Sequence, residues 1–505
     1  MKRITRYAAL AAVLGTFSFG ASARGENLGF TADSAAPSPI MLYDVDAGDA
    51  PVTDAASSAV ASDAGAVEEE AIDADAAILE LRRQIESMRE ETSDLKARLD
   101  KAEKKPDGKG KTDKFTTKFG GQFKFDGAVV SQDDDARAGF GEARNSVGVR
   151  DIRVTASGSG YGRYQYSFGM SIHDHITLRH AYFRVKDTPL LGDITVGHFF
   201  VESGMESVQT NYERYFGTVD EDESFFRIGR RLGAASTIFG QDKRSRLFLG
   251  LFASASIESA PERLNGEHCG TILNARYTTL PIYVEDSDGF AREVLHLGGS
   301  CYIVDPASTA PLVSRTRGLG WTGTNPYFIS GLEALNGSNY TVGAIEAAYQ
   351  KEGFNIMGEG YLRSIDGRGN AYGATLTMLC MLTPNASRTY NKQDGRFGGI
   401  KMAEDQLFLD YCNRQVGRNW GAWEAVAKWE WTQANDVKDC ECDISRAAPP
   451  IYGTVNRMVL GMNWFWNESM NWAFNWEHAF VDSHQMGRDL KGDFDTMLIQ
   501  TSIKF

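Results

Sequence analysis

Apolar and polar residues alternate with a period of two in many segments between Phe115 and the C-terminus. In residues 117–130, Phe119, Phe123 and Phe125 share one face, and Lys124 lies on the other. The same pattern recurs in RYQYSFGMSI (163–172), WEAVAKWEW (423–431), MVLGMNWFW (458–466), MNWAFNWEH (470–478) and MLIQTSIKF (497–505). A period of two that persists for about ten residues predicts β-strands with one apolar face.

The apolar faces could pack on a second sheet in a soluble β-protein or face lipid in a membrane barrel. Strands of about ten residues suit a tilted membrane crossing, and the polar faces carry too many charges for a dry core. Eight of the nine tryptophans lie in residues 420–476, as an aromatic girdle requires. The chain also ends on an alternating strand with a terminal Phe505. We therefore expect a transmembrane β-barrel over residues 115–505, with long polar connections such as 257–330.

The N-terminus has the three parts of a secretory signal in order. A basic MKRITRY is followed by an apolar AALAAVLGTFSFG and a small-residue site, Ala21–Ala23. We expect residues 1–23 to be a signal peptide and the mature chain to be exported. The alternative is an N-terminal core helix. No stretch after residue 25 is apolar for the ~18 residues that a membrane helix needs.

Two segments of different composition precede the barrel. Residues 24–77 hold 12 acidic residues and one basic residue, so they carry −11 of the net charge of −14; with few aromatic residues, residues 24–75 are predicted to be disordered. Residues 76–104 then show apolar positions at alternating spacings of three and four, which predict a coiled coil. A helix packed on its own chain is the alternative, and the heptads do not fix dimer against trimer. Residues 105–114 are a Gly- and Pro-containing linker.

The six cysteines occupy positions 269, 301, 380, 412, 440 and 442. In an exported chain this favours disulfides in loops. A metal site built from Cys440, Cys442, His268 and Cys269 is the alternative, but the spacing fits no common zinc pattern. We expect no metal, no cofactor and no nucleic-acid partner.

An unusual cluster of positive charge occurs in FFRIGRRLG at 225–233, where Arg227, Arg230 and Arg231 lie among apolar residues. Fixed cations near a narrow part of a pore would favour anions, and the planar guanidinium suits phosphate. Alternatively, the cluster is a solvated turn or is neutralised by the nearby acidic run 220–223.

The segment 180–237 resembles the phosphate-selective porin O and P family. It contains Ala181-Tyr182, then Gly197-His198-Phe199, then Gly229-Arg230-Arg231-Leu232-Gly233 at the end of a long connection. EAAYQKEGFNIMGEGYLR (346–363), DGRFGGIK (394–401) and the C-terminal strands agree in order, so the resemblance covers roughly 115–505. In the family, a lysine and a proline usually follow the Gly-x-Phe; here Phe200, Val201 and Glu202 follow.

The resemblance implies a trimeric barrel of sixteen antiparallel strands in the outer membrane, with a loop folded into the pore. It implies passive diffusion of small hydrophilic solutes, such as phosphate. An outer-membrane enzyme is the alternative, but no Gly-x-Ser-x-Gly elbow accompanies His173, His175 and His180, so we expect no enzymatic activity. We expect a constriction that binds anions and a basic track on lumen-facing positions. The constriction residues are Arg214, Arg227, Arg230 and Arg231, and the track residues are Lys118, Lys124, Arg163, Arg184 and Lys186. A non-selective porin, or a barrel that tethers the membrane through its coiled coil, remains an alternative.

Overall fold

The computed structural model describes most of the chain from Phe115 onward. The described residues are 115–173, 176–209, 225–240, 242–254, 270–286, 290–305, 315–317, 326–330, 339–384, 386–402, 420–435, 451–485 and 487–505. The predicted signal peptide, acidic segment, coiled coil and linker lie outside them. Among the described residues, no helix is long and apolar enough to span a membrane.

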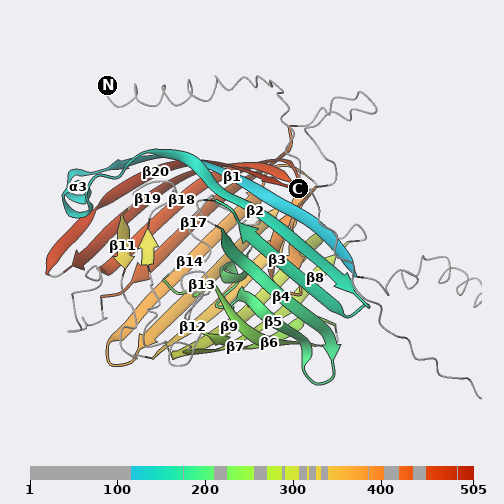
Figure 1. Cartoon of the computed structure of the whole chain (residues 1–505). Coiled ribbons are helices and arrows are strands. Elements are labelled where there is room, and N and C mark those ends of the chain that lie inside the picture. The colour runs from blue at the N-terminus through green and yellow to red at the C-terminus, as the bar shows by residue number, and fades with distance from the viewer. Residues whose placement is uncertain are drawn as a thin grey trace, which may run out of the picture. The chain divides into compact units, whose positions relative to one another are not determined.

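Sixteen strands form a closed antiparallel barrel, which confirms the predicted fold (Figure 1). Each strand pairs with its neighbour in chain order, and the first strand pairs with the last. The strands are β1 (Thr116–Gln132), β2 (Ser146–Gly160), β3 (Tyr164–Ser171), β4 (Thr177–Thr188), β5 (Gly192–Phe200), β6 (Arg230–Phe239), β7 (Ser245–Ala253), β8 (Thr271–Glu285), β9 (Ala291–Asp305), β12 (Tyr340–Lys351), β13 (Phe354–Ile365), β14 (Gly369–Met381), β17 (Ala422–Gln433), β18 (Tyr452–Asn467), β19 (Met470–Gln485) and β20 (Arg488–Lys504).

In the described part of the chain, four further strands and two short helical segments are not part of the barrel wall. They are α3 (Asp134–Phe140), the 3-10 turn η3 (Glu206–Val208), the pair β10 (Arg315–Arg317) and β11 (Tyr327–Ser330), and the hairpin of β15 (Ala386–Asn391) and β16 (Arg396–Met402). The pair and the hairpin are separate two-stranded sheets that do not join the barrel.

The two ends of the described chain form the seam of the barrel. Strands β1 and β20 pair in register from Gln122 with Lys504 to Gln132 with Phe494. Phe505 extends this ladder, because its amide donates to Gly121 O at 3.1 Å and the Gly121 amide donates to Phe505 O at 3.0 Å. A Cβ atom on Gly121 would lie 2.5 Å from the Phe505 ring, so this close approach requires glycine.

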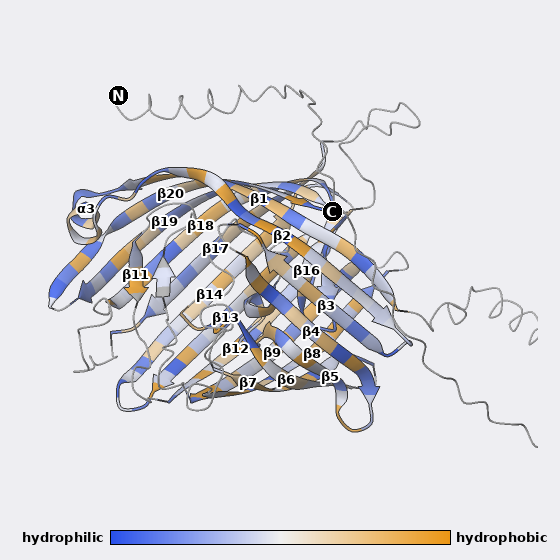
Figure 2. Ribbon diagram, viewed as in Figure 1, coloured by the Kyte–Doolittle hydropathy of each residue, from blue (hydrophilic) through white to orange (hydrophobic). Residues whose placement is uncertain are grey.

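The strands present one apolar and one polar face, as the period of two predicts. In β1, Phe119 and Phe125 are exposed on the outside, whereas Lys124 and Asp126 are buried on the inside. Figure 2 shows the alternation of hydrophobic and hydrophilic residues along the strands. Since exposed apolar side chains cover the outer face, the barrel suits a lipid environment.

Short turns gather at the end of the barrel that carries Phe115 and Phe505. They include 161–163, 189–191, 352–353 and 468–469, whereas connections such as 201–229 and 306–339 leave the opposite end. Short turns mark the periplasmic end of outer-membrane barrels. A cluster of tryptophans lies at the same end: the Trp423 and Trp464 rings stack at 5.1 Å, and Trp466 lies 5.3 Å from Trp464. This placement fits an interfacial aromatic belt.

The expectation of a long polar connection over 257–330 was wrong. This stretch contains the barrel strands β8 and β9, and also the short strands β10 and β11. The alternation in β8 and β9 is real but weak: outward positions include Thr279, Gly299 and Cys301, and inward positions include the apolar Ile272 and Val304. The inner face is apolar here because residues of the connection between β5 and β6 pack against it. The usual contrast between the two faces is therefore lost.

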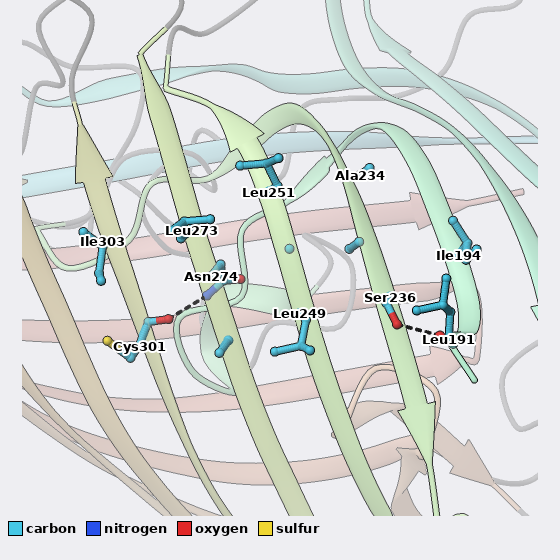
Figure 3. Close-up of a pocket in the computed structure, with 13 residues that line it drawn as sticks. Leu191, Ile194, Ala234, Ser236, Leu249, Leu251, Leu273, Asn274, Cys301 and Ile303 are labelled. Carbon is cyan, nitrogen blue, oxygen red and sulfur yellow. Dashed lines mark hydrogen bonds between the residues drawn. The ribbon is translucent and has the colours of Figure 1, made fainter.

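The outer faces of β5 to β9 form a shallow apolar hollow (Figure 3). Leu249, Leu251, Leu273 and Ile303 line it over a floor of small residues. Cys301 also lines it as a free thiol, and Cys380 is a free, exposed thiol on β14. These two cysteines therefore form no loop disulfide; the other four lie outside the described residues.

We expect Leu249→Arg to lower the free energy of unfolding by about 2–4 kcal/mol, because an outward charge at mid-strand must enter hydrocarbon. Leu249 is 45% exposed at the centre of β7. Urea titration of the protein refolded into phospholipid vesicles measures the effect. Lys243→Ala, in the turn before β7, should change the free energy of unfolding by less than about 0.5 kcal/mol. Equal effects of the two substitutions would contradict the lipid-facing assignment.

Candidate functional site

The described ends of the connection between β5 and β6, residues 201–209 and 225–229, lie inside the barrel, as expected for an inward loop. Phe225, Phe226 and Ile228 are buried and pack against apolar side chains of the wall. The Phe226 ring stacks on Tyr361 of β13 at 5.2 Å, and the Tyr302 hydroxyl of β9 donates to Phe226 O at 2.9 Å. Burying aromatic surface inside the lumen holds this end of the loop in place.

The start of the same connection is fixed by polar contacts to two strands. The Glu202 amide donates to Asn274 Oδ1 at 3.0 Å, and Asn274 Nδ2 donates back to Glu202 O at 2.8 Å. Further on, the Met205 and Glu206 amides donate to Glu359 Oε1. Gly204 has φ +133°, and a Cβ there would lie 2.8 Å from the Glu359 carboxylate, so the turn onto β13 requires glycine.

The three clustered arginines lie at the end of this inward loop, but each contacts a different group. Arg227 Nη2 donates to Glu206 Oε2 at 2.5 Å. The Arg230 guanidinium lies 3.9 Å from the centre of the Phe200 ring. Arg231 donates from Nε to Ser254 O at 3.0 Å and from Nη1 to Arg230 O at 2.7 Å. The three residues thus lie close in the chain at the end of the loop but have different partners, and Arg230 and Arg231 are buried.

A fourth arginine, Arg363 of β13, faces the same region. Its guanidinium lies 4.1 Å from the centre of the Tyr340 ring, and its Nη1 donates to Phe225 O at 3.2 Å. Arg227, Arg231 and Arg363 all interact electrostatically with the Tyr302 hydroxyl. The cluster thus has one member that the sequence did not indicate, because Arg363 lies 132 positions beyond Arg231 and is a single charge within a strand.

A carboxylate that pairs with Arg227 is that of Glu206. The acidic run 220–223 lies outside the described residues. Lys428 Nζ also contacts Glu206 Oε2, at 3.0 Å. Burial opposes the ionisation of Glu206, but Lys428 and Arg227 outweigh it and lower the pKa of this carboxyl to about 2. Glu206 is therefore charged at neutral pH and reduces the positive field of Arg227.

The low pKa predicts how acid affects the inward loop. A folded-state pKa of about 2 lies below the ordinary value of 4.5, so the ionised carboxylate stabilises the folded state fully above pH ~4.5 and its contribution is lost as the pH falls through 2. We expect Glu206→Gln to lower the free energy of unfolding by about 3 kcal/mol at pH 7. This difference from the unmodified protein should shrink towards zero near pH 2 in urea titrations. A difference independent of pH would show that the carboxylate charge is not responsible.

A second acidic residue of the loop, Glu202, is buried between two arginines of the wall. Arg246 binds both of its carboxylate oxygens, at 2.6 and 2.7 Å, and Arg276 Nη1 lies 3.2 Å from Oε2. Arg276 Nε also contacts Glu346 Oε1 at 2.9 Å. Glu202 thus neutralises arginines of the barrel wall.

The hairpin β15–β16 enters the lumen from the end that carries the short turns. Arg388 on β15 binds both carboxylate oxygens of Glu424 on β17, at 2.8 and 2.5 Å. The Tyr390 hydroxyl lies 2.6 Å from Nδ1 of His296 on β9, and Gln393 Nε2 donates to Asp193 Oδ2 on β5 at 3.0 Å. The hairpin therefore contacts strands on several sides of the lumen and narrows it.

The other predicted basic residues are distributed differently. Lys124 is buried on the inner face of β1, Arg184 Nε donates to Thr195 Oγ1 at 2.9 Å, and Lys186 is half-buried on β4. Lys118 is exposed near the start of β1, in the same phase as Lys124, and Arg163 is exposed in the turn 161–163. The place of both residues on the basic track stays a prediction. Arg214 lies outside the described residues.

Bases outnumber acids among the buried charged side chains that the structure describes. Eleven are basic and eight are acidic. The basic residues are Lys124, Arg150, Arg153, Arg230, Arg231, Arg246, Arg276, Arg363, Arg388, Arg396 and Arg457, and the acidic ones are Asp126, Asp151, Asp193, Glu202, Glu346, Glu359, Glu424 and Glu477. These buried side chains of the described residues thus carry a net positive charge, although the whole chain is negative. Within the described ranges, no group of three or more His, Cys, Asp or Glu side chains could hold a metal ion.

Comparison with known proteins gives one family match. A family model described as phosphate-selective porin O and P matches residues 123–505. No curated protein matches the chain.

Several solved structures are similar in fold. An anion-selective porin from Comamonas acidovorans is 9% identical, with a TM-score of 0.46 over 78% of this chain and 100% of that one. A loop L8 deletion mutant of the outer membrane protein OmpT of Vibrio cholerae is 10% identical, with a TM-score of 0.45 over the same shares. The outer membrane channel DcaP of Acinetobacter baumannii is 10% identical, with a TM-score of 0.42 over 77% of this chain and 97% of that one.

Proposed function

Because the chain belongs to the phosphate-selective porin O and P family, a family of outer-membrane channels, we propose that it conducts small anions such as phosphate through its lumen by passive diffusion. The observation that carries this proposal is the cluster of Arg227, Arg230 and Arg231 on an inward loop, together with the excess of buried basic residues. Fixed positive charge beside a low-dielectric wall attracts anions and repels cations.

In this proposal Arg230, Arg231 and Arg363 form the anion-selective constriction, while Arg227 is partly neutralised by Glu206. Arg214 is assigned to the same region from the resemblance alone. Lys124, Arg184 and Lys186 supply a basic approach along the inner wall. A planar guanidinium group can donate to two phosphate oxygens at once. The rings of Phe200 and Tyr340 hold the guanidinium groups of Arg230 and Arg363 in place.

A general, weakly selective porin is the second candidate function. Glu202 and Glu206 favour it, because each lies on the inward loop and contacts two wall or loop cations. We further propose, from the family resemblance, that the chain is exported through its signal peptide and assembles as a homotrimer. Chemical cross-linking of the protein in detergent tests the trimer.

Single-channel recording in a planar bilayer separates the two functions. A reversal potential near the chloride equilibrium potential in a KCl gradient, with block of the current by low concentrations of phosphate, would support the selective channel. A large conductance with weak or cation-favouring selectivity and no phosphate effect would support the general porin. Absence of any conductance from folded protein would refute both.

A further inference from the structure

The Glu202 carboxylate is held as a bound ligand would be. Arg246 forms two roughly parallel bonds to it, Nη2 to Oε1 at 2.6 Å and Nη1 to Oε2 at 2.7 Å. Arg276 Nη1 approaches Oε2 from β8 at 3.2 Å. This fork-to-fork arrangement is the one by which arginine recognises free carboxylates. The side chains are nearly inaccessible, with 8% of the Glu202 side chain and none of that of Arg276 exposed.

The two arginines are oriented by groups other than Glu202. Arg246 Nε donates to Gln393 O at 2.8 Å in the turn of the β15–β16 hairpin. Arg276 donates to Asp394 O at 2.9 Å and Gly395 O at 2.7 Å in the same turn, and its Nε contacts Glu346. Removing the Glu202 carboxylate would therefore leave both guanidinium groups in position, as a preorganised site.

The loop is likewise held by groups other than this carboxylate. Two hydrogen bonds between the Glu202 backbone and Asn274 fix the chain at this point. Contacts of the Met205 and Glu206 amides with Glu359 fix the next turn. The Glu202 side chain can therefore leave the arginines while the loop backbone stays in place.

From these contacts we infer that Arg246 and Arg276 form a binding subsite for small monocarboxylate anions, in which Glu202 is a tethered competing ligand. The charge of the ligand follows from the balance of charged side chains around the two arginines. Two arginines face Glu346 and Glu202, so loss of the Glu202 charge leaves one uncompensated positive charge. The space vacated by shortening Glu202 to alanine matches a formate or acetate ion. Passage of such solutes to the subsite rests on the proposed function.

The tether explains why the subsite would be closed in the unmodified protein. A carboxylate attached to the adjacent loop acts at a high effective concentration, so a free anion competes poorly with it. Binding should become strong once the tethered group is removed, because hydrogen bonds from charged donors to a carboxylate are among the stronger ones in proteins.

The test is the thermal stability of the purified protein in detergent as formate replaces chloride at constant ionic strength. For Glu202→Ala we expect a saturable rise in Tm whose half-saturating formate concentration is roughly tenfold or more below that of the unmodified protein. Glu202→Gln keeps the side-chain volume and should lower the half-saturating formate concentration by a smaller factor. The double variant Glu202→Ala with Arg246→Met should lose the formate response.

Heat-modifiable migration in gels confirms that each variant retains the barrel. If folded Glu202→Ala and Glu202→Gln both respond to formate as the unmodified protein does, the inference is wrong. A formate response that persists in the double variant would also overturn it. This readout does not depend on conduction: a formate site in a protein without anion selectivity would refute the proposed function alone, and an anion-selective channel without the site would refute only the inference.

Discussion

Replacing Arg227, Arg230 and Arg231 together with glutamine should lower the permeability ratio of chloride to potassium about tenfold. Two charges 8 Å apart interact by about 2 kcal/mol at an effective dielectric constant of 20, so the loss of several fixed charges beside the permeation path has a large effect. Arg230 and Arg231 should account for most of the change, because Arg227 is already paired with Glu206.

The reversal potential in a KCl gradient measures this ratio directly. A matched control replaces three exposed basic residues outside the predicted track, Lys243, Lys351 and Lys491, with glutamine and removes the same total charge from the chain. This control should change the ratio by less than twofold, since exposed charges more than a Debye length from the path are screened. Equal effects of the two triple variants would place the selectivity outside the arginine cluster.

Replacing Arg388 with alanine should release the β15–β16 hairpin from the wall and increase the current noise or the mean conductance of single channels. Arg388 and Glu424 are both almost fully buried, and their bidentate pair is the ionic link between the hairpin and β17. Removal of one partner leaves a buried, uncompensated carboxylate, which costs about 3–5 kcal/mol.

The double variant Arg388→Met with Glu424→Met distinguishes loss of the pair from loss of the charge balance. Apolar replacement of both partners of a buried pair is often nearly neutral, so this variant should keep the hairpin docked and the current quiet. Protease sensitivity of the hairpin in folded protein gives an independent measurement. A quiet, protease-resistant Arg388→Ala channel would show that the remaining hairpin contacts suffice.

The barrel was predictable from the sequence because most strands repeat an apolar outer face. Strands β1, β3 and β17 to β20 show this contrast clearly. Strands β8 and β9 were missed because their inner face is apolar where the inward loop packs. A pattern that depends on an aqueous lumen fails locally where protein fills the lumen.

The site was only partly predictable. The three arginines of the inward loop are adjacent in the sequence and stood out for that reason. Arg246 and Arg276 are isolated charges at polar strand positions, and their partner Glu202 lies 44 and 74 positions away. Only the strand order, which no local pattern encodes, brings such residues together. The sequence equally gave no signal that the segment 386–402 would turn into the lumen.

The pairing of β1 with β20 has a consequence for biogenesis. Strand β20 follows β1 and both segments that fill the interior in the chain, so it is synthesised after them. The edge of β1 that pairs with β20 therefore stays unpaired until the rest of the wall and the two interior segments have been synthesised. A chain truncated before Arg488 would retain the arginines of the inward loop and the hairpin, but it would lack β20, the strand with which β1 closes the barrel.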